Sequence, residues 1–131
     1  MERKIPENLS TDKTEYSVQD FFKQYKKIVK LNSIILLGVD GKLQYDFSKS
    51  NDGIWTMHFE NGFIKSITQG KTDDYTARVS VPFKDIVNVF NSYPEPRDAI
   101  KEGIIKIDGD IHFVDMLAHV INTRKEKFKQ Q

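Results

Sequence analysis

Three polar side chains near the carboxyl end have a spacing at which one helix face could hold a metal ion. His112, Asp115 and His119 are three and four residues apart, so a helix would place them on one side. Imidazole and carboxylate groups bind zinc, but a further ligand to complete the site is not evident. A polar strip on an otherwise apolar helix also needs no metal to explain it. We therefore expect no metal site.

The other residue patterns of catalysis are missing from the sequence. It contains no Gly-rich phosphate loop, no nucleophile elbow and no spaced carboxylate pair, and the glycines of "NGFIKSITQG" are explained by turns. The chain has no cysteine, which excludes disulfides, thiol nucleophiles and thiolate metal ligands. His58 alternates with apolar residues and is expected to face solvent. We predict a protein without catalytic residues or a cofactor.

Length and composition limit the remaining function classes. The 131 residues suffice for one domain with its own core, and the 38% of hydrophobic residues excludes a disordered chain. The formal charge of +1 gives no general attraction to nucleic acid, so no nucleic-acid partner is expected. Residues 1–16 lack the apolar run of a signal peptide, and no stretch approaches the roughly 20 apolar residues of a membrane span. A cytoplasmic protein is expected.

The amino-terminal half predicts an arm, a helix and a set of strands. Residues 1–15 are polar without a period and are expected to be a mobile arm, and residues 16–131 form one domain. Ser17 can cap a helix that runs to about Leu31, with Asp20 completing the capping box. The apolar residues of this helix recur at spacings of three and four, and its lysines are expected to form a solvated face. The segment "SIILLGV", residues 33–39, fits either a buried strand or a turn of helix.

Period-two patterns predict strands in residues 42–47, 54–60, 63–69 and 77–83. Asn61 and Gly62 tolerate the positive φ of a type I′ turn, which places Glu60 opposite Phe63. In that register Trp55, Met57, Phe59 and Ile64 share the apolar face. The four strands follow one another as a meander, so an antiparallel sheet with one dry face is expected.

The carboxyl-terminal half predicts two short helices, a strand and a long apolar helix. Pro82 suits the start of the first helix, and Pro96 can start the second, which ends near Gly103. After a short strand Gly109 turns the chain, and Asp110 can cap the last helix. Apolar residues cover more than half the circumference of that helix, so it must contact a second apolar surface besides the sheet: a helix, another subunit or a lipid.

From about Val18 to Asn122 the sequence resembles the sterol carrier protein 2 (sterol-binding domain) family. The resembling stretches are "LQYDFS", "GIWTMHFENG", "DYTARVSVPFKDIVNVF" and "AIKEGIIKIDGD" with the apolar helix that follows. The resemblance implies an α+β fold: a mostly antiparallel five-stranded sheet with helices packed on it, enclosing a hydrophobic tunnel. It also favours helix for residues 33–37. The chain departs from the family at Pro82, where a Ser or Thr usually caps the helix, and at "NSYP", where a glycine often closes it.

The resemblance implies a non-catalytic protein that binds, transfers or senses a lipid such as a fatty acid, acyl-CoA, phospholipid or sterol. Phenylalanine and methionine suit such a pocket because they cannot hold water, although the same stripes are typical of a filled core. The predicted lipid-binding residues are Trp55, Met57, Phe59, Val81, Phe83, Val87, Phe90, Ile105, Phe113, Met116, Leu117 and Val120.

The alternative is a ligand-free structural or interaction module of the same fold. In that case the surplus apolar face of the last helix packs on another protein or on a second copy in a homodimer. Transient membrane contact is a further expectation, because the terminal "NTRKEKFKQQ" is basic, although cations at a helix end also complement the helix dipole.

Overall fold

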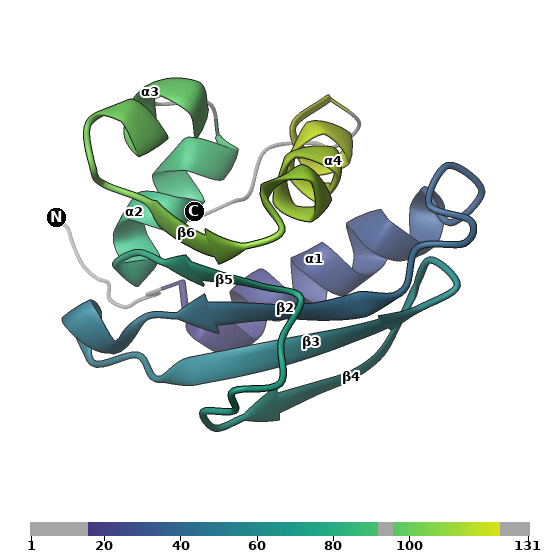
Figure 1. The fold of residues 1–131 in the computed structure, drawn as a ribbon, viewed down its shortest axis with the longest axis horizontal. Helices are drawn as coiled ribbons and strands as arrows, with labels where there is room; N and C mark the ends of the chain where they lie inside the picture. Colours follow the sequence, from purple (N-terminus) through teal and green to yellow (C-terminus); the bar gives the residue numbers. More distant parts are fainter. Residues whose placement is uncertain (1–15, 92–95, 124–131) are drawn as a thin grey trace, which may run out of the picture.

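The computed structural model describes residues 16–91 and 96–123, and the predicted arm of residues 1–15 lies outside them, as do residues 92–95 of the "NSYPEP" turn and residues 124–131 of the basic tail. Helices α1, α2 and α4 cover one face of a single five-stranded sheet (Figure 1). In chain order the elements are α1 (Val18–Leu31), β2 (Gly41–Asp46), a 3₁₀ turn (Ser48–Ser50), β3 (Ile54–Glu60), β4 (Phe63–Gln69), β5 (Ala77–Ser80), α2 (Phe83–Phe90), α3 (Pro96–Lys101), β6 (Lys106–Gly109) and α4 (Ile111–Thr123).

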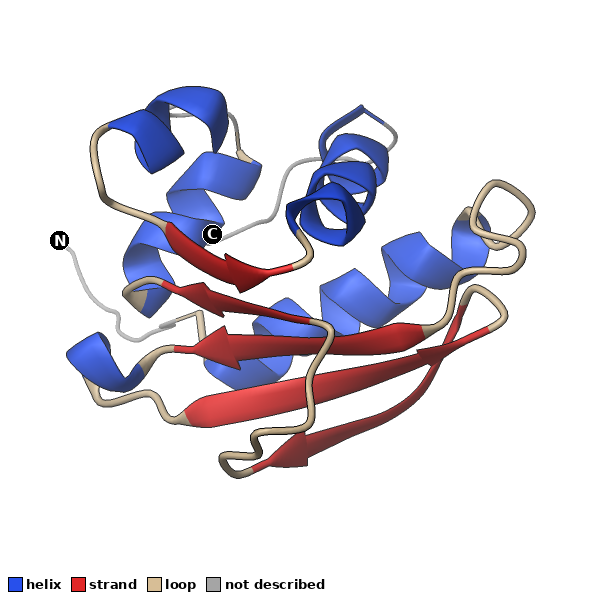
Figure 2. Cartoon of the chain, in the orientation of Figure 1, coloured by secondary structure: helices blue, strands red, loops and turns tan. Residues whose placement is uncertain are grey.

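The sheet is mixed, which corrects the expected meander. Its order is β4-β3-β2-β5-β6, and three of the four strand pairs are antiparallel while β2 and β5 are parallel. The loop of residues 70–76 leaves β4 and crosses β3 and β2 before β5 begins (Figure 2). β5 therefore pairs with the free edge of β2 rather than with β4. A parallel neighbour requires such a crossover, which strand periodicity does not reveal.

The predicted start of α1 is confirmed by a complete capping box. The Ser17 hydroxyl accepts a hydrogen bond from the Asp20 amide, and the Asp20 carboxylate accepts one from the Ser17 amide, each at 3.1 Å. The apolar stripe of α1 then faces the sheet. Phe21 is fully buried at the centre of an aromatic cluster, where its ring stacks on Phe90 and meets Tyr45 edge to face. This cluster joins α1, α2 and β2 in one core.

The hairpin between β3 and β4 has the predicted turn and register. Asn61 and Gly62 have φ values of 50° and 84°, and Glu60 pairs with Phe63. A bulge between His58 and Phe59 shifts the rest of the pairing, yet Met57 and Phe59 stay fully buried on the inner face.

Residues 33–37 do not form the expected helix. Residues 32–38 are a series of hydrogen-bonded turns between α1 and β2, and of residues 33–37 only Leu36 is buried. The turn is held by the neighbouring hairpin, since the Gly62 amide donates to the Val39 carbonyl at 2.9 Å. A tertiary contact therefore decides the conformation that the local sequence left open.

Helix α2 begins after Pro82, which occupies the N-cap position and offers no side-chain cap. The hydroxyl of Ser50, in the 3₁₀ turn, instead accepts a hydrogen bond from the Phe83 amide at 3.0 Å. A residue 33 positions earlier in the chain thus satisfies the first amide of the helix.

Helix α4 follows β6 directly, as predicted. Gly109 has a φ of 97°, and the Asp110 carboxylate accepts hydrogen bonds from the amides of His112 and Phe113. The helix contacts β5 and also α1 and α2, so neighbouring helices cover its second apolar side. Ile111 and Met116 remain 44% and 36% exposed. None of the helices within the described residues is long and apolar enough to cross a lipid bilayer.

Candidate functional site

A small apolar cavity lies between the sheet and the carboxyl-terminal helices. Its volume is about 40 Å³, and its walls come from α1, β2, β5, α2, α3, β6 and α4. It is lined by Tyr25, Leu43, Tyr45, Val79, Ile86, Val89, Phe90, Pro96, Ile100, Ile105, Ile107, Val114, Asp115, Leu117 and Ala118. Asp115 is exposed and Leu117 is buried, so the cavity extends from the core to the surface of α4.

The cavity is much smaller than a lipid. Pockets for drug-sized ligands hold roughly 300–1,000 Å³. A continuous tunnel, as the family resemblance implied, is not seen among the described residues, whose core is closely filled. The observed state is therefore a closed one, and a lipid could occupy this place only if the surrounding helices separated.

Two buried tyrosines contribute hydroxyl groups to the lining of this cavity. The Tyr45 hydroxyl, from β2, donates a hydrogen bond to the Tyr25 hydroxyl, from α1, at 3.1 Å. Burial raises the pKa of both hydroxyls well above the ordinary value of 10.0, so both stay neutral at any physiological pH. Two hydroxyls carry two protons, and one hydrogen bond uses only one of them. The pair can therefore donate one further hydrogen bond.

Three of the twelve predicted lipid-binding residues line the cavity. Phe90, Ile105 and Leu117 meet there, from α2, from the approach to β6 and from α4. The other nine lie elsewhere in the fold.

Most of those nine are packed in the core. Phe59 and Phe113 meet edge to face with ring centroids 6.0 Å apart, and Phe83 lies against Phe21 and Phe47. The remaining buried members are Met57, Val81, Val87 and Val120. Two are less enclosed: Trp55 is half-buried beside Phe22, and Met116 is 36% exposed on α4. Which of the twelve would touch a lipid stays a prediction.

Sequence reasoning missed several cavity residues for one reason. Tyr25, Leu43 and Val79 were visible as apolar residues of α1, β2 and β5, but a meander places β5 far from β2. The parallel pairing sets Tyr45 beside Val79 and brings the α2, α3 and β6 residues over the same place. The seven residues between β4 and β5, residues 70–76, are too few for a helical crossover and gave no signal for this arrangement.

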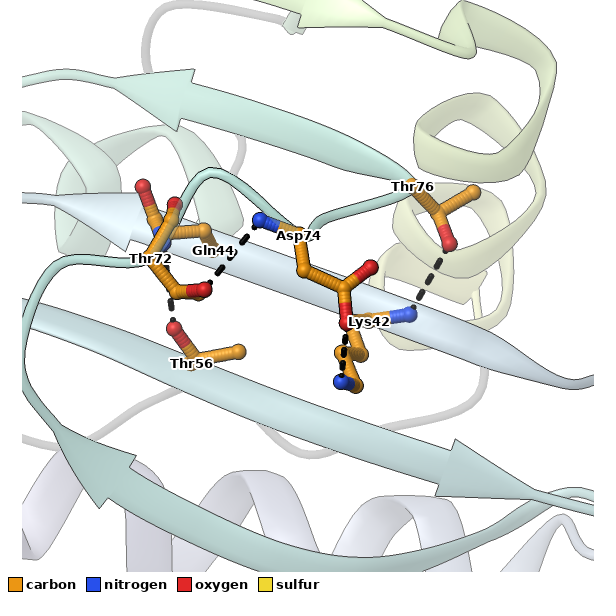
Figure 3. A network of polar contacts seen from close by, with 6 residues as sticks. All are labelled: Lys42, Gln44, Thr56, Thr72, Asp74 and Thr76. Carbon is orange, nitrogen blue, oxygen red and sulfur yellow. Dashed lines mark hydrogen bonds and ion pairs between the residues drawn. The ribbon is translucent and has the colours of Figure 1, made fainter.

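The opposite face of the sheet is polar. The loop of residues 70–76 is fixed there by hydrogen bonds to β2 and by the ion pair of Lys42 with Asp74, whose atoms are 2.7 Å apart (Figure 3). Gln44 is fully buried beneath the loop and donates to the Thr72 carbonyl and the Thr56 hydroxyl. Because hydroxyl, amide and charged groups dominate this face, an apolar ligand has no site on it.

The helix face that was considered as a metal site lies on the surface of the protein. His112, Asp115 and His119 are all exposed on α4. Among the described residues no group of three or more histidine, cysteine, aspartate or glutamate side chains could hold a metal ion.

Comparison with known structures identifies the fold. The palmitated sterol carrier protein SCP2L2 of Aedes aegypti matches with a TM-score of 0.64 and 23% identity over 84% of this chain and 98% of that one. Domain 2 of the sterol carrier protein of Helicoverpa armigera matches with a TM-score of 0.65 and 20% identity, over 91% and 98%. A variant of the sec-alkylsulfatase Pisa1, an enzyme known from Pseudomonas sp., matches with a TM-score of 0.74 and 17% identity over 90% of this chain. The present chain spans only 18% of that variant's length.

A search of curated proteins finds no significant match. The model of the SCP-2 sterol transfer family matches residues 22–122, which include the sheet, the cavity and most of α4. The fold comparison and the family match agree. This chain therefore belongs to the SCP-2 sterol transfer family.

Proposed function

We propose that this protein binds a lipid, without catalysis, in the space between the sheet and helices α2, α3 and α4. The observation that carries the proposal is the apolar cavity inside the segment that matches the family. The similar structure from Aedes aegypti is described as palmitated, which supports an acyl chain as the first ligand to test. Each methylene of such a chain that leaves water contributes about 0.8 kcal/mol of binding free energy.

The ligand classes that fit are a fatty acid, an acyl-CoA, a phospholipid and a sterol. Each has a long apolar body and a polar end that can accept hydrogen bonds. The Tyr25 and Tyr45 pair supports this choice, since its spare hydroxyl proton can meet a hydroxyl, carboxyl or ester oxygen inside the core.

Lipid uptake requires the cavity to widen. The walls most easily displaced are α3, which has only six residues, and α4, whose Asp115 borders the opening. Separation of these helices from β5 and β6 would expose Ile105 and Leu117 to an incoming chain without breaking the sheet. The protein would then exchange between a closed, filled core and an open, lipid-bound form.

A ligand-free interaction module is the second candidate, and the small size of the cavity favours it. In that case the core stays closed and Ile111 and Met116, both exposed on α4, contact a partner or a second copy.

The deciding experiment is native mass spectrometry of the purified protein, with extraction and identification of any released lipid, followed by titration with a fluorescent fatty acid. Ala118→Leu adds side-chain volume to the cavity wall and should weaken fatty-acid binding about tenfold, the loss of one to two buried methylenes. Ile111→Ala, on the exposed side of the same helix and outside both the cavity lining and the predicted lipid-binding residues, is the matched control and should bind normally. If neither extraction nor titration detects a lipid, the interaction module takes the place of the carrier.

A further inference from the structure

The segment that joins α1 to β2 is apolar and faces solvent. From Leu31 to Val39 it reads "LNSIILLGV" and contains no charged residue. The exposed fractions of its large side chains are 75% for Leu31, 86% for Ile34, 49% for Ile35 and 69% for Leu37. Phe63, just after the hairpin turn that contacts the segment, is 49% exposed. Five of the seven large hydrophobic side chains that are exposed among the described residues thus lie at this end of the molecule.

Contacts with the core and the hairpin hold this apolar loop, residues 31–39, in place. Leu36 is fully buried, and a Cβ on Gly62 would lie 2.5 Å from the Leu36 carbonyl oxygen, so the two backbones are in direct contact. The Gly38 amide donates to the Asn61 side-chain oxygen at 2.8 Å. Because the loop is anchored at both points, its other leucine and isoleucine side chains cannot turn inward and remain in water at a cost in free energy.

Most backbone amides of the apolar loop are already hydrogen-bonded. The amides of Ile35 and Leu36 donate to the Asn32 carbonyl, and the amides of Leu37 and Val39 donate to the carbonyls of Ile34 and Leu36. A segment most of whose amides are bonded within the protein loses few hydrogen bonds to water when it enters a lipid interface.

Cationic side chains precede the apolar loop. Lys23, Lys26, Lys27 and Lys30 are all exposed on α1, and none of them makes an ion pair within residues 16–91 and 96–123. Two exposed carboxylates flank the loop: Asp40, which follows it in the chain and accepts a hydrogen bond from the Asn61 amide, and Glu60 in the hairpin, which is 3.4 Å from Lys65. The apolar loop and the unpaired lysines beside it complement an anionic membrane. Its headgroups attract the lysines, and its apolar interior accepts the side chains of the loop. A second copy docked on the same face would instead add more lysines of like charge.

We propose that the apolar loop and Phe63 insert into the interface of an anionic membrane while the lysines of α1 contact the lipid headgroups. The proposal goes beyond lipid binding in the core and does not depend on it. A protein that never opens its cavity could still dock in this way, and a carrier could fail to dock.

Vesicle flotation of the full chain tests the proposal. The wild-type protein should float with vesicles of phosphatidylcholine and phosphatidylserine, and much less with phosphatidylcholine alone. The triple variant Ile34→Ser, Ile35→Ser and Leu37→Ser should lose binding at least about tenfold, since these side chains supply the apolar contact. Its thermal unfolding should match that of the wild type, because all three side chains are exposed.

Three further variants separate the contributions of the lysines and of the other exposed apolar side chains. Lys26→Gln and Lys30→Gln should each lower binding to the anionic vesicles about fivefold, and added salt should remove this difference. The pair Ile111→Ser and Met116→Ser removes exposed apolar side chains from α4 and should leave vesicle binding unchanged. Absence of flotation by the wild type, or equal flotation of the triple variant, would overturn the proposal. Sedimentation showing a wild-type dimer that the triple variant breaks, without flotation, would assign the surface to a second copy instead.

Discussion

The hydroxyl oxygens of Tyr45 and Tyr25 lie 3.1 Å apart in the core, although the residues are 20 positions apart in the chain and come from a strand and a helix. Each is the other's hydrogen-bond partner, and both rings border the apolar cavity. The pair therefore links the stability of the core to the chemistry that a bound lipid would meet. Phenylalanine substitutions can separate the contribution of this pair to core stability from its hydrogen bonding to a bound lipid.

Tyr45→Phe should destabilise the protein by about 1–3 kcal/mol, because it leaves the Tyr25 hydroxyl buried without a partner. The double variant with Tyr25→Phe should lose less than the sum of the two single losses, since no hydroxyl then remains unpaired. Urea unfolding of the four proteins measures this coupling. Strict additivity would show that the hydroxyls do not interact.

Alkaline pH should unfold the protein through the same pair. Burial raises the pKa of both tyrosines in the folded state, whereas in the unfolded chain they ionise near the ordinary value of 10.0. The folded state therefore holds its tyrosine protons at a pH where the unfolded chain releases them. The stability contribution is complete below pH 10.0 and falls as pH rises further. Unfolding free energies measured across that range should fall less steeply for the double phenylalanine variant, and an unchanged slope would exclude the pair as the cause.

Ser50→Ala should destabilise α2 by about 1 kcal/mol, although Ser50 is not in that helix. The variant loses the bond from the Phe83 amide, which Pro82 cannot replace, together with the bond that the Ser50 hydroxyl donates to the Phe47 carbonyl at 3.1 Å. Lys49→Ala, in the same 3₁₀ turn but with an exposed side chain, is the control and should be nearly neutral. Thermal unfolding compares the two, and equal effects would mean that the hydroxyl of Ser50 does not act as a cap.

Gly109→Ala should be more harmful than Gly103→Ala. Both glycines have positive φ, 97° and 81°, so alanine is strained at each by about 1–2 kcal/mol. At Gly109 the new Cβ would also lie 2.5 Å from the Thr76 carbonyl oxygen, while at Gly103 it meets nothing within 4 Å. The clash should add about 1–3 kcal/mol, measurable by urea unfolding. Equal losses would show that β5 and the β6 turn are not packed this closely.

The sequence by itself determined the features whose partners are close along the chain. Ser17 and Asp20 are three residues apart, Asn61 and Gly62 are adjacent, and Asp110 caps residues two and three positions later. In each case one short-range interaction outweighs the alternatives, so the residue types suffice. The order of the helices and strands, and with it the family resemblance, could be predicted on the same basis.

Only the tertiary structure decided where distant segments meet. The parallel pairing of β2 with β5, the cap that Ser50 gives to α2, the Tyr25 and Tyr45 pair and the outward apolar loop all join residues far apart in sequence. Periodicity tells which side of an element is apolar, but not which other element covers it. Of the twelve residues predicted to bind lipid, all but Trp55 and Met116 are buried, and only three line the cavity. The apolar pattern specifies burial, whereas the position of a cavity depends on how closely the facing side chains fill the space between layers.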